Sequence, residues 1–248
     1  MNRHVIRKGK TRRERFGQRR RDDAQAEAAA AWEPRTELGR KVKAHEVTSI
    51  DEIFNNGKHI AETGVIDTLL PNLQDEVVEI VSVQRMTKNN RKMKFRATVI
   101  VGDGAGHVGI GAAKDIESRA AVNAAIVAAK YNIIPVILGC GSMQCRCGTR
   151  HSLPITARGK CGSVEVILKP APRGLGIVAN KPVRRMLQLA GVSDAWSFSK
   201  GRTRVKYNSL MAVYRALQGV NSMKNAQSFA VGSAGAEAPQ QVAVQPST

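Results

Sequence analysis

The sequence predicts an α+β protein of two successive units: a helix, three strands and a helix, followed by a two-layer α/β unit. Two β-branched runs, Val77–Met86 and Met93–Val101, flank a short polar segment and predict a hairpin. Residues 115–130 change to helical spacing of the apolar positions. After Pro135, strand-like and helix-like segments alternate, which favours a second unit with helices layered on a sheet.

The first unit opens with a short predicted helix. Ser49 and Glu52 have the spacing of a capping box, so we expect a helix from Ile50 to Asn55. A glycine-rich turn at residues 102–106 leads into alternating residues 107–111, which predict the third strand. The helix that follows is rich in alanine and can lie close on the sheet. Its expected apolar face consists of Ile116, Ala120, Ala124 and Val127.

The second unit is predicted from alternating signals. Val164–Lys169 is β-branched and reads as a strand, and a Pro/Gly loop at residues 170–176 follows it. Pro182 stands where a helix tolerates proline, at its start, and Gly191 ends that helix. A last helix is expected after Asn208. Its predicted buried side consists of Leu210, Val213, Tyr214 and Leu217.

The chain carries a large positive charge. Its 248 residues include 39 Lys and Arg against 20 Asp and Glu, a formal charge of +19 at pH 7. This balance favours a polyanionic partner, whether RNA, DNA or an acidic membrane surface. Ten of the cations fall in the first 21 residues beside a single acid, Glu14. That density predicts an extended arm that neutralises phosphates, and a merely solvated tail is the alternative.

Other features of the composition narrow the class of protein. A hydrophobic content of 42% is enough to bury a core. No apolar run approaches the roughly 20 residues that span a bilayer, and the amino terminus lacks the apolar stretch of a signal peptide. We therefore expect an intracellular protein without a membrane partner. Aromatic residues make up only 4% of the chain, which argues against base stacking as the main mode of binding.

Residues Gly104–Gly109 have the spacing G-x-G-x-x-G of a dinucleotide-binding loop. The context is unsuitable, because an alternating strand pattern follows the last glycine where that fold needs a helix. A turn that needs positive φ explains the glycines adequately. We expect no nucleotide site here.

One cluster of sequence has the soft ligands that zinc prefers, and tetrahedral zinc needs four of them converging on one point. Its members are Cys140, Cys145, Cys147, His151 and Cys161. The Cys-x-Cys spacing departs from the usual Cys-x2-Cys knuckle, and free cysteines are common as small buried residues. A cysteine nucleophile activated by His151 would need an orienting carboxylate, and none stands nearby in the sequence. We expect no metal, no cofactor and no catalytic residue. The weak zinc candidates are Cys140, Cys145, Cys147 and Cys161.

The predicted first unit has the layout of double-stranded-RNA-binding domains, which read the shape of an A-form duplex. A tight turn would project the hairpin cations toward a groove or phosphates, and a solvated hairpin is the alternative. Arg184 and Arg185 follow a helix amino terminus, where the dipole disfavours cations, so an anionic partner would explain them. The predicted RNA-binding residues are Arg12, Arg13, Arg19, Arg20, Lys88, Asn89, Arg91, Lys92, Lys94, Arg96, Lys114, Arg119, Arg158, Lys160, Lys181, Arg184 and Arg185.

Two blocks of sequence resemble the family of the universal fifth protein of the small ribosomal subunit, known in eukaryotes as protein two. The hairpin signature of that family matches across Arg91–Glu117. A second block matches across Gly162–Ile177 and continues to Gly191. Residues 32–43 and 140–161 resemble the archaeal and eukaryotic branch of the family.

The resemblance implies a structural, non-enzymatic constituent of the small ribosomal subunit, in the cytoplasm. Its hairpin tip would reach ribosomal RNA near the decoding region, beside the entrance for messenger RNA, and support subunit assembly and translational accuracy. The implied partners are ribosomal RNA, messenger RNA in the entry channel and neighbouring small-subunit proteins. The residues implied in contact with a neighbouring protein are Pro172, Arg173 and Gly174.

The expected organisation combines both lines of reasoning. A basic extended arm would occupy residues 1–45 and a double-stranded-RNA-binding-like domain residues 46–139. A two-layer α/β domain with the left-handed βαβ crossover implied by the resemblance would occupy residues 140–224, before a disordered tail at 225–248. Two rivals remain open at this point: a zinc- or cysteine-dependent enzyme, and a free-standing regulator that binds duplex RNA.

Overall fold

The computed structural model describes residues 32–145 and 147–222, which form two compact units. Of these residues, the first unit holds 32–103 and 109–133, and the second holds 104–108 and everything from 134 onward. The division falls a few residues before the predicted boundary between 139 and 140. The strand that follows the glycine-rich turn contributes to both units, because its first residues belong to the second.

Three short helices begin the first unit: α2 (Glu37–Lys43), α3 (Ile50–Asn55) and α4 (Thr63–Leu69). The predicted helix is confirmed, since α3 covers the expected residues. The predicted capping box is wrong, because the side chain of Ser49 makes no capping hydrogen bond. Buried side chains from all three helices form one hydrophobic cluster, which includes Val42, Ile50, Ile53, Val65 and Ile66.

The described residues before α3, 32–49, pack within the first unit. The predicted arm, residues 1–45, is therefore too long, because residues 32–45 belong to this unit. The hydroxyl of Thr36 accepts a hydrogen bond from the amide of Gly39 at 3.1 Å and caps α2. The ring of Trp32 lies so close to Gly64 that a Cβ there would meet it at 2.4 Å. Packing of Trp32 and Val42 in the hydrophobic cluster stabilises this segment, whereas an extended arm would leave both side chains in water. This burial explains why the segment folds instead of extending.

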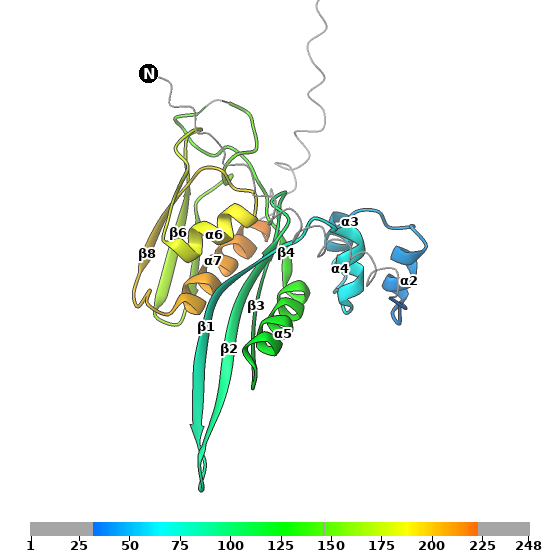
Figure 1. Cartoon of the computed structure of the whole chain (residues 1–248). Coiled ribbons are helices and arrows are strands. Elements are labelled where there is room, and N and C mark those ends of the chain that lie inside the picture. The colour runs from blue at the N-terminus through cyan, green and yellow to red at the C-terminus, as the bar shows by residue number, and fades with distance from the viewer. Residues whose placement is uncertain (1–31, 146, 223–248) are drawn as a thin grey trace, which may run out of the picture. The chain divides into compact units, whose positions relative to one another are not determined.

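The first sheet has the strand order β1-β2-β3-β4. Its strands are β1 (Gln74–Met86), β2 (Arg91–Gly102), β3 (His107–Asp115) and β4 (Ile133–Pro135). The predicted hairpin is confirmed, and both of its strands extend further than the sequence indicated. Figure 1 shows β1 and β2 continuing as a two-stranded ribbon well past α5 (Ser118–Tyr131), with the turn at its end.

The register between β1 and β2 shifts once. Val77 pairs with Val99, but Glu79 pairs with Thr98, so β1 holds one extra residue at this point. Such a bulge bends and twists the strand locally. Beyond the bulge the pairing is regular up to Met86 and Arg91, at the start of the turn.

The helix α5 packs on β2 through a face that sequence spacing did not predict. Its buried residues are Ala121, Ala125 and Ala129. A Cβ on Gly111 would lie 2.1 Å from the carbonyl oxygen of Ala125, and one on Gly109 would lie 2.3 Å from that of Ala129. The helix therefore rests directly on the glycines of β3, and only alanines fit between helix and sheet. The expected face is exposed or half-buried: Ile116, Ala120, Ala124 and Val127.

The glycine-rich turn before β3 leads into a strand, as the sequence indicated, so no helix follows the motif G-x-G-x-x-G. Gly104 and Gly106 have φ of +71° and +129°, which a residue with a side chain rarely adopts. The conformation of the turn accounts for these glycines without a nucleotide.

The second unit contains a four-stranded sheet of order β5-β6-β8-β7. Strands β5, β6 and β8 pair antiparallel, and β7 lies parallel to β8. The connection from β7 through α6 to β8 is therefore a βαβ crossover between neighbouring strands. The elements are β5 (Ala157–Cys161), β6 (Val164–Pro170), β7 (Ile177–Val178), α6 (Lys181–Leu189), β8 (Ala195–Lys200) and α7 (Lys206–Asn221).

The helices of this unit confirm most of their predicted features. Pro182 lies in the first turn of α6, and Gly191 follows the helix with φ of +84°. In α7, Leu210, Val213 and Leu217 are buried, whereas Tyr214 is only half-buried. Strands β5 and β8 were not predicted. Residues 157–161, Ala-Arg-Gly-Lys-Cys, contain no β-branched side chain that would predict a strand. The strand forms through antiparallel pairing with β6 and through the contact of its buried residues with α7.

The contact between β5 and α7 makes position 159 sensitive to substitution. A Cβ on Gly159 would lie 1.9 Å from the carbonyl oxygen of Ala212, so Gly159→Ala must push α7 off the sheet. We expect a loss of about 2 kcal/mol in the free energy of unfolding, within the range for overpacked cores. Urea unfolding followed by far-UV circular dichroism would measure it.

Gly219→Ala is the matched control, because nothing lies within 4 Å of a Cβ at this position of α7. Alanine should leave stability unchanged or raise it by about 0.5–1 kcal/mol through its better helix propensity. Equal destabilisation by both changes would show that the close approach at Gly159 is not what limits the packing.

Candidate nucleic-acid interface

The hairpin tip is a closed turn that holds its central residues outward. The amide of Thr87 donates to the carbonyl oxygen of Asn90 at 2.9 Å, and the amide of Asn90 donates to the hydroxyl of Thr87 at 3.3 Å. The side-chain oxygen of Asn90 accepts from the amide of Arg91 at 2.7 Å. Lys88 and Asn89, both predicted RNA-binding residues, are exposed at the end of this turn.

Cations line one face of the hairpin. Successive side chains of a strand point to opposite faces, so Lys92, Lys94 and Arg96 share the face of β2 opposite α5. Arg85 pairs directly with Lys92 and therefore joins them. Arg91 lies on the other face. Arg85 was missed among the candidates, although its pairing with Lys92 next to the turn places it on the face opposite α5.

The distal hairpin carries no acidic residue. Residues 85–96 include six Lys and Arg and neither Asp nor Glu. Within the described chain, none of the four on the face opposite α5 has a carboxylate within ion-pair distance, and the Nε of Arg96 is buried without a hydrogen-bond partner. Like charges that lie this close repel each other unless an external anion neutralises them. The arrangement therefore suits phosphates.

The remaining predicted RNA-binding residues of the two units are exposed but more scattered. In the first unit, Lys114 lies near the end of β3 and Arg119 in the first turn of α5. In the second, Arg158 and Lys160 alternate along β5 with residues buried against α7. Lys160 pairs directly with Glu165 of β6, which reduces its value as a cationic contact.

A second group of cations stands at the amino terminus of α6. The side chain of Asn180 caps the helix by accepting from the amide of Lys181 at 2.8 Å. Lys181, Arg184 and Arg185 are exposed, and together with Gln188 they line a shallow depression. Because the helix dipole is positive at this end, helix and side chains together favour an anion.

The loop before β7 presents the predicted protein-contact residues. The amide of Leu175 donates to the carbonyl oxygen of Pro172 at 3.4 Å, and Gly174 has φ of +90°, so the turn needs a glycine. The amide of Gly176 donates to Oδ1 of Asp194 at 2.7 Å and fixes the base of the loop. Arg173 is exposed at its tip.

Four of the predicted RNA-binding residues belong to the arm. Arg12, Arg13, Arg19 and Arg20 of the arm lie outside the described residues, as does the tail expected at 225–248. The structure brings together the hairpin cations within the first unit and the α6 cations within the second.

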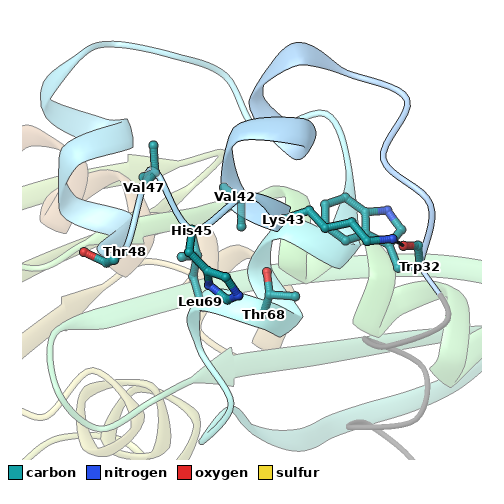
Figure 2. A pocket seen from close by; sticks show the side chains of 8 residues that line it. All are labelled: Trp32, Val42, Lys43, His45, Val47, Thr48, Thr68 and Leu69. Carbon is teal, nitrogen blue, oxygen red and sulfur yellow. Dashed lines mark hydrogen bonds between the residues drawn. The ribbon is translucent and has the colours of Figure 1, made fainter.

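A pocket in the first unit offers no catalytic machinery. Figure 2 shows Trp32 and Lys43 close together at one end, where Nζ of Lys43 donates to the carbonyl oxygen of Trp32 at 3.0 Å. The hydroxyl of Thr68 donates to carbonyl oxygens of its own helix. His45 is the one imidazole among the lining residues, which include no carboxylate and no thiol. The full lining is Trp32, Val42, Lys43, His45, Val47, Thr48, Thr68 and Leu69.

The cysteine-rich segment is more ordered than its spacing suggested. Cys140, Cys145 and Cys147 converge with His151, and their ligand atoms all lie within 4.8 Å of one another. Cys161 does not belong to this group, because it ends β5, where it pairs with Val164. All four members were named from the sequence as soft ligands, together with Cys161.

The expectation that no carboxylate orients His151 is wrong, since Nδ1 of His151 lies 2.8 Å from Oδ2 of Asp194. Asp194 was missed because it is 43 residues away in sequence. Hydrogen bonds from the hydroxyl and amide of Thr149 lower the pKa of Cys147 to about 6, whereas burial raises the pKa of Cys140. No oxyanion site is evident around these thiols within the described residues, so the group resembles a set of ligands more than a catalytic triad.

Comparisons with known proteins identify the family of the chain. Residues 73–137 match the family description "Ribosomal protein S5, N-terminal domain", and residues 159–229 match "Ribosomal protein S5, C-terminal domain". Small ribosomal subunit protein uS5 of Aeropyrum pernix is 53% identical over 76% of this chain and 86% of its own length. The chain belongs to the uS5 family. The uS5 proteins of Methanococcoides burtonii and Methanoregula boonei are 48% and 43% identical, over 78% and 80% of this chain and 92% and 97% of their own lengths.

Membership of the uS5 family decides between the open alternatives. As a uS5 protein the chain is a structural ribosomal protein that binds RNA, and it is not an enzyme. The two matched segments correspond to the first sheet with α5 and to most of the second unit. None of the described helices combines the length and the apolar character needed to cross a membrane.

The cationic face of this uS5 hairpin predicts a salt-dependent interaction. Each phosphate contact contributes about one unit to the slope of log affinity against log salt concentration. Replacing both Lys92 and Lys94 with alanine should therefore reduce the slope by about two for the full chain binding small-subunit ribosomal RNA. Filter binding at several salt concentrations would measure it.

The matched control replaces the same two lysines with arginine, which keeps the charge. Its slope should equal that of the unchanged chain. An unaltered slope in the alanine variant would exclude these side chains from phosphate contact.

Proposed function

We propose that the chain braces ribosomal RNA near the decoding region of the small subunit and beside the entrance for messenger RNA. The observation that carries the proposal is the acid-free distal hairpin, residues 85–96, which presents six cations on a ribbon that continues past α5. A ribbon of this kind can enter a crowded RNA interior, where a globular surface could not follow. Its backbone hydrogen bonds are paired along its length, so the tip keeps a fixed position relative to the first unit.

The bracing itself would be electrostatic. Cationic side chains neutralise phosphates and position the protein without reading sequence, and the folded unit holds these contacts at fixed separations. The low aromatic content agrees with this mode, because recognition of unpaired bases relies on stacking. Neutralising the charge of several RNA segments would support assembly of the subunit, since those segments otherwise repel one another.

The second unit would supply two further contacts. The cations of α6 would face RNA, either ribosomal or messenger, in the entry channel. Arg173, at the tip of the loop before β7, would contact a neighbouring small-subunit protein together with Pro172 and Gly174. The support is the exposure of Arg173 and Gly174 on a turn whose base is anchored by Asp194. A change in this contact would alter how firmly two proteins are held together, and through it the accuracy of decoding.

The proposed setting is the cytoplasm, with ribosomal RNA, messenger RNA and small-subunit proteins as partners and no membrane. A chain with a charge of +19 would bind most RNA to some degree, so the position on the subunit must come from shape as well as charge.

Changing the tip should affect decoding more than folding. We expect cells that depend on a variant with Lys88, Arg91 and Lys92 replaced by alanine to assemble fewer small subunits or to misread more codons. Each lost contact removes phosphate neutralisation at the far end of the hairpin, where no core residue is disturbed. Gradient sedimentation would measure assembly, and a reporter that needs a misread codon would measure accuracy.

The charge-conserving control places lysine at position 91 and arginine at positions 88 and 92. It should behave nearly as the unchanged chain does. Normal subunit levels together with normal accuracy in the alanine variant would remove the tip from the proposed function.

A further inference from the structure

Residues 140–151 form a loop with almost no apolar side chains of its own. Its ends are joined by an antiparallel bridge in which the amides of Gly139 and Ser152 each donate to the other's carbonyl oxygen, at 2.8 and 2.9 Å. Between Gly141 and Arg150, none of the described residues is buried. Met143, the one large apolar side chain there, is fully exposed. Hydrophobic burial therefore does not hold this loop in place.

The bridge brings the first and last ligand-type residues together. Gly141 lies so close to the backbone of Pro154 that a Cβ would meet the carbonyl oxygen of Pro154 at 1.9 Å. A turn then returns the chain, with the amide of Cys145 donating to the carbonyl oxygen of Ser142 at 3.2 Å. Gly148, with φ of +63°, makes the last reversal before His151. Four side chains consequently point into the centre of the loop.

The distances between their ligand atoms fit one tetrahedral ion. Sγ of Cys140 and Sγ of Cys147 are 3.6 Å apart, and Nε2 of His151 lies 3.3 Å from Sγ of Cys140 and 3.8 Å from Sγ of Cys145. Metal–sulfur and metal–nitrogen bonds of about 2.3 and 2.0 Å at tetrahedral angles place such atoms about 3.5–3.8 Å apart. The observed values scatter around this separation.

The imidazole is held in the tautomer that a metal needs. Nδ1 of His151 lies 2.8 Å from Oδ2 of Asp194, and both side chains are buried. A proton on Nδ1 leaves the lone pair of Nε2 directed at the three sulfurs. The amides of Ser193 and Asp194 also donate to the carbonyl oxygen of His151, at 2.9 and 3.0 Å, so ring and backbone are fixed together. A carboxylate behind a histidine in this way is the usual outer partner of a zinc ligand.

We propose that Cys140, Cys145, Cys147 and His151 bind one zinc ion, which cross-links the loop in place of a hydrophobic core. Three thiolates and an imidazole are soft ligands that suit zinc and exclude magnesium and calcium, which require oxygen. An iron–sulfur cluster needs cysteine sulfurs spread around several metal atoms, whereas these converge on a single point. With four protein ligands the site has no open position, so the ion is structural and not catalytic.

The choice between zinc and the rival states of these thiols can be tested on the full chain, purified under reducing conditions. Elemental analysis should find one zinc per chain. Replacing the metal with Co²⁺ should give the sulfur-to-cobalt charge-transfer bands and the intense visible bands of tetrahedral cobalt. A folded chain without zinc and without those bands, or one with a Cys140–Cys147 disulfide in its place, would overturn the proposal.

Two variants identify the ligands. Cys145→Ser with Cys147→Ser should abolish stoichiometric zinc, whereas Cys161→Ser should retain it, because Cys161 lies outside the group. Equal zinc content in all three proteins would overturn the assignment. Since the double variant could fail to fold, its far-UV circular dichroism is compared with that of the unchanged chain after removal of zinc by a chelator. The cobalt spectrum of the unchanged chain needs no variant and decides independently.

Asp194 is a positioning residue in this proposal. Asp194→Asn should weaken zinc binding by about 10- to 100-fold, as loss of an outer partner typically does, while saturating zinc still gives one ion per chain. Competition with a chromophoric chelator would measure the affinity. The matched control is Asp67→Asn, which breaks an ion pair with Lys130 in the first unit and should leave zinc affinity unchanged. Equal affinity in both variants would show that Asp194 does not support the ligand.

Discussion

Both units depend on one type of contact, a helix resting directly on the glycines of a strand. In the first unit the carbonyl oxygens of α5 approach Gly109 and Gly111, and in the second those of α7 approach Gly159. Where no side chain intervenes, helix and sheet come closer than an ordinary leucine-rich core permits, and packing is lost abruptly if a methyl group is added. The layers are thin and tightly fixed, which suits a protein whose surface contacts must stay at constant separations.

A thin core leaves much of the surface for charge. Along β5, arginine and lysine alternate with residues pressed against α7, and along the distal part of β2 the cations likewise follow the two-residue period. The same alternation therefore decides both which side chains pack and which remain for phosphates. The cost is electrostatic repulsion within the hairpin, which the fold alone does not relieve and which a polyanion does. Structure and binding are linked through charge, and not through a pocket.

Local signals in the sequence predicted a large part of this. The hairpin and α6 follow from β-branched runs and from a proline at a helix start, because each of these acts within a few residues. The spacing of Ser49 and Glu52 located α3, although Ser49 makes no capping hydrogen bond. The buried face of α5 was predicted wrongly, since spacing favours large apolar side chains and the glycines of β3 select small ones. Asp194 and His151 could not be paired from sequence, because only the folded chain brings together residues 43 positions apart. For the same reason Cys161 could not be separated from the other cysteines.

The extra residue in β1 changes which of its residues face α5. Before the bulge, Val77 lies opposite Val99 on the side of α5; after it, Ile80 and the even-numbered residues take that side. Odd-numbered Arg85 is thereby assigned to the side of Lys92. Deleting one residue of β1 between the bulge and the turn would move Arg85 to the side of α5, whereas deleting two would keep it on the side of Lys92. Deleting the extra residue at the bulge itself would leave the charge pattern unchanged, because pairing with β2 assigns the distal residues to their sides.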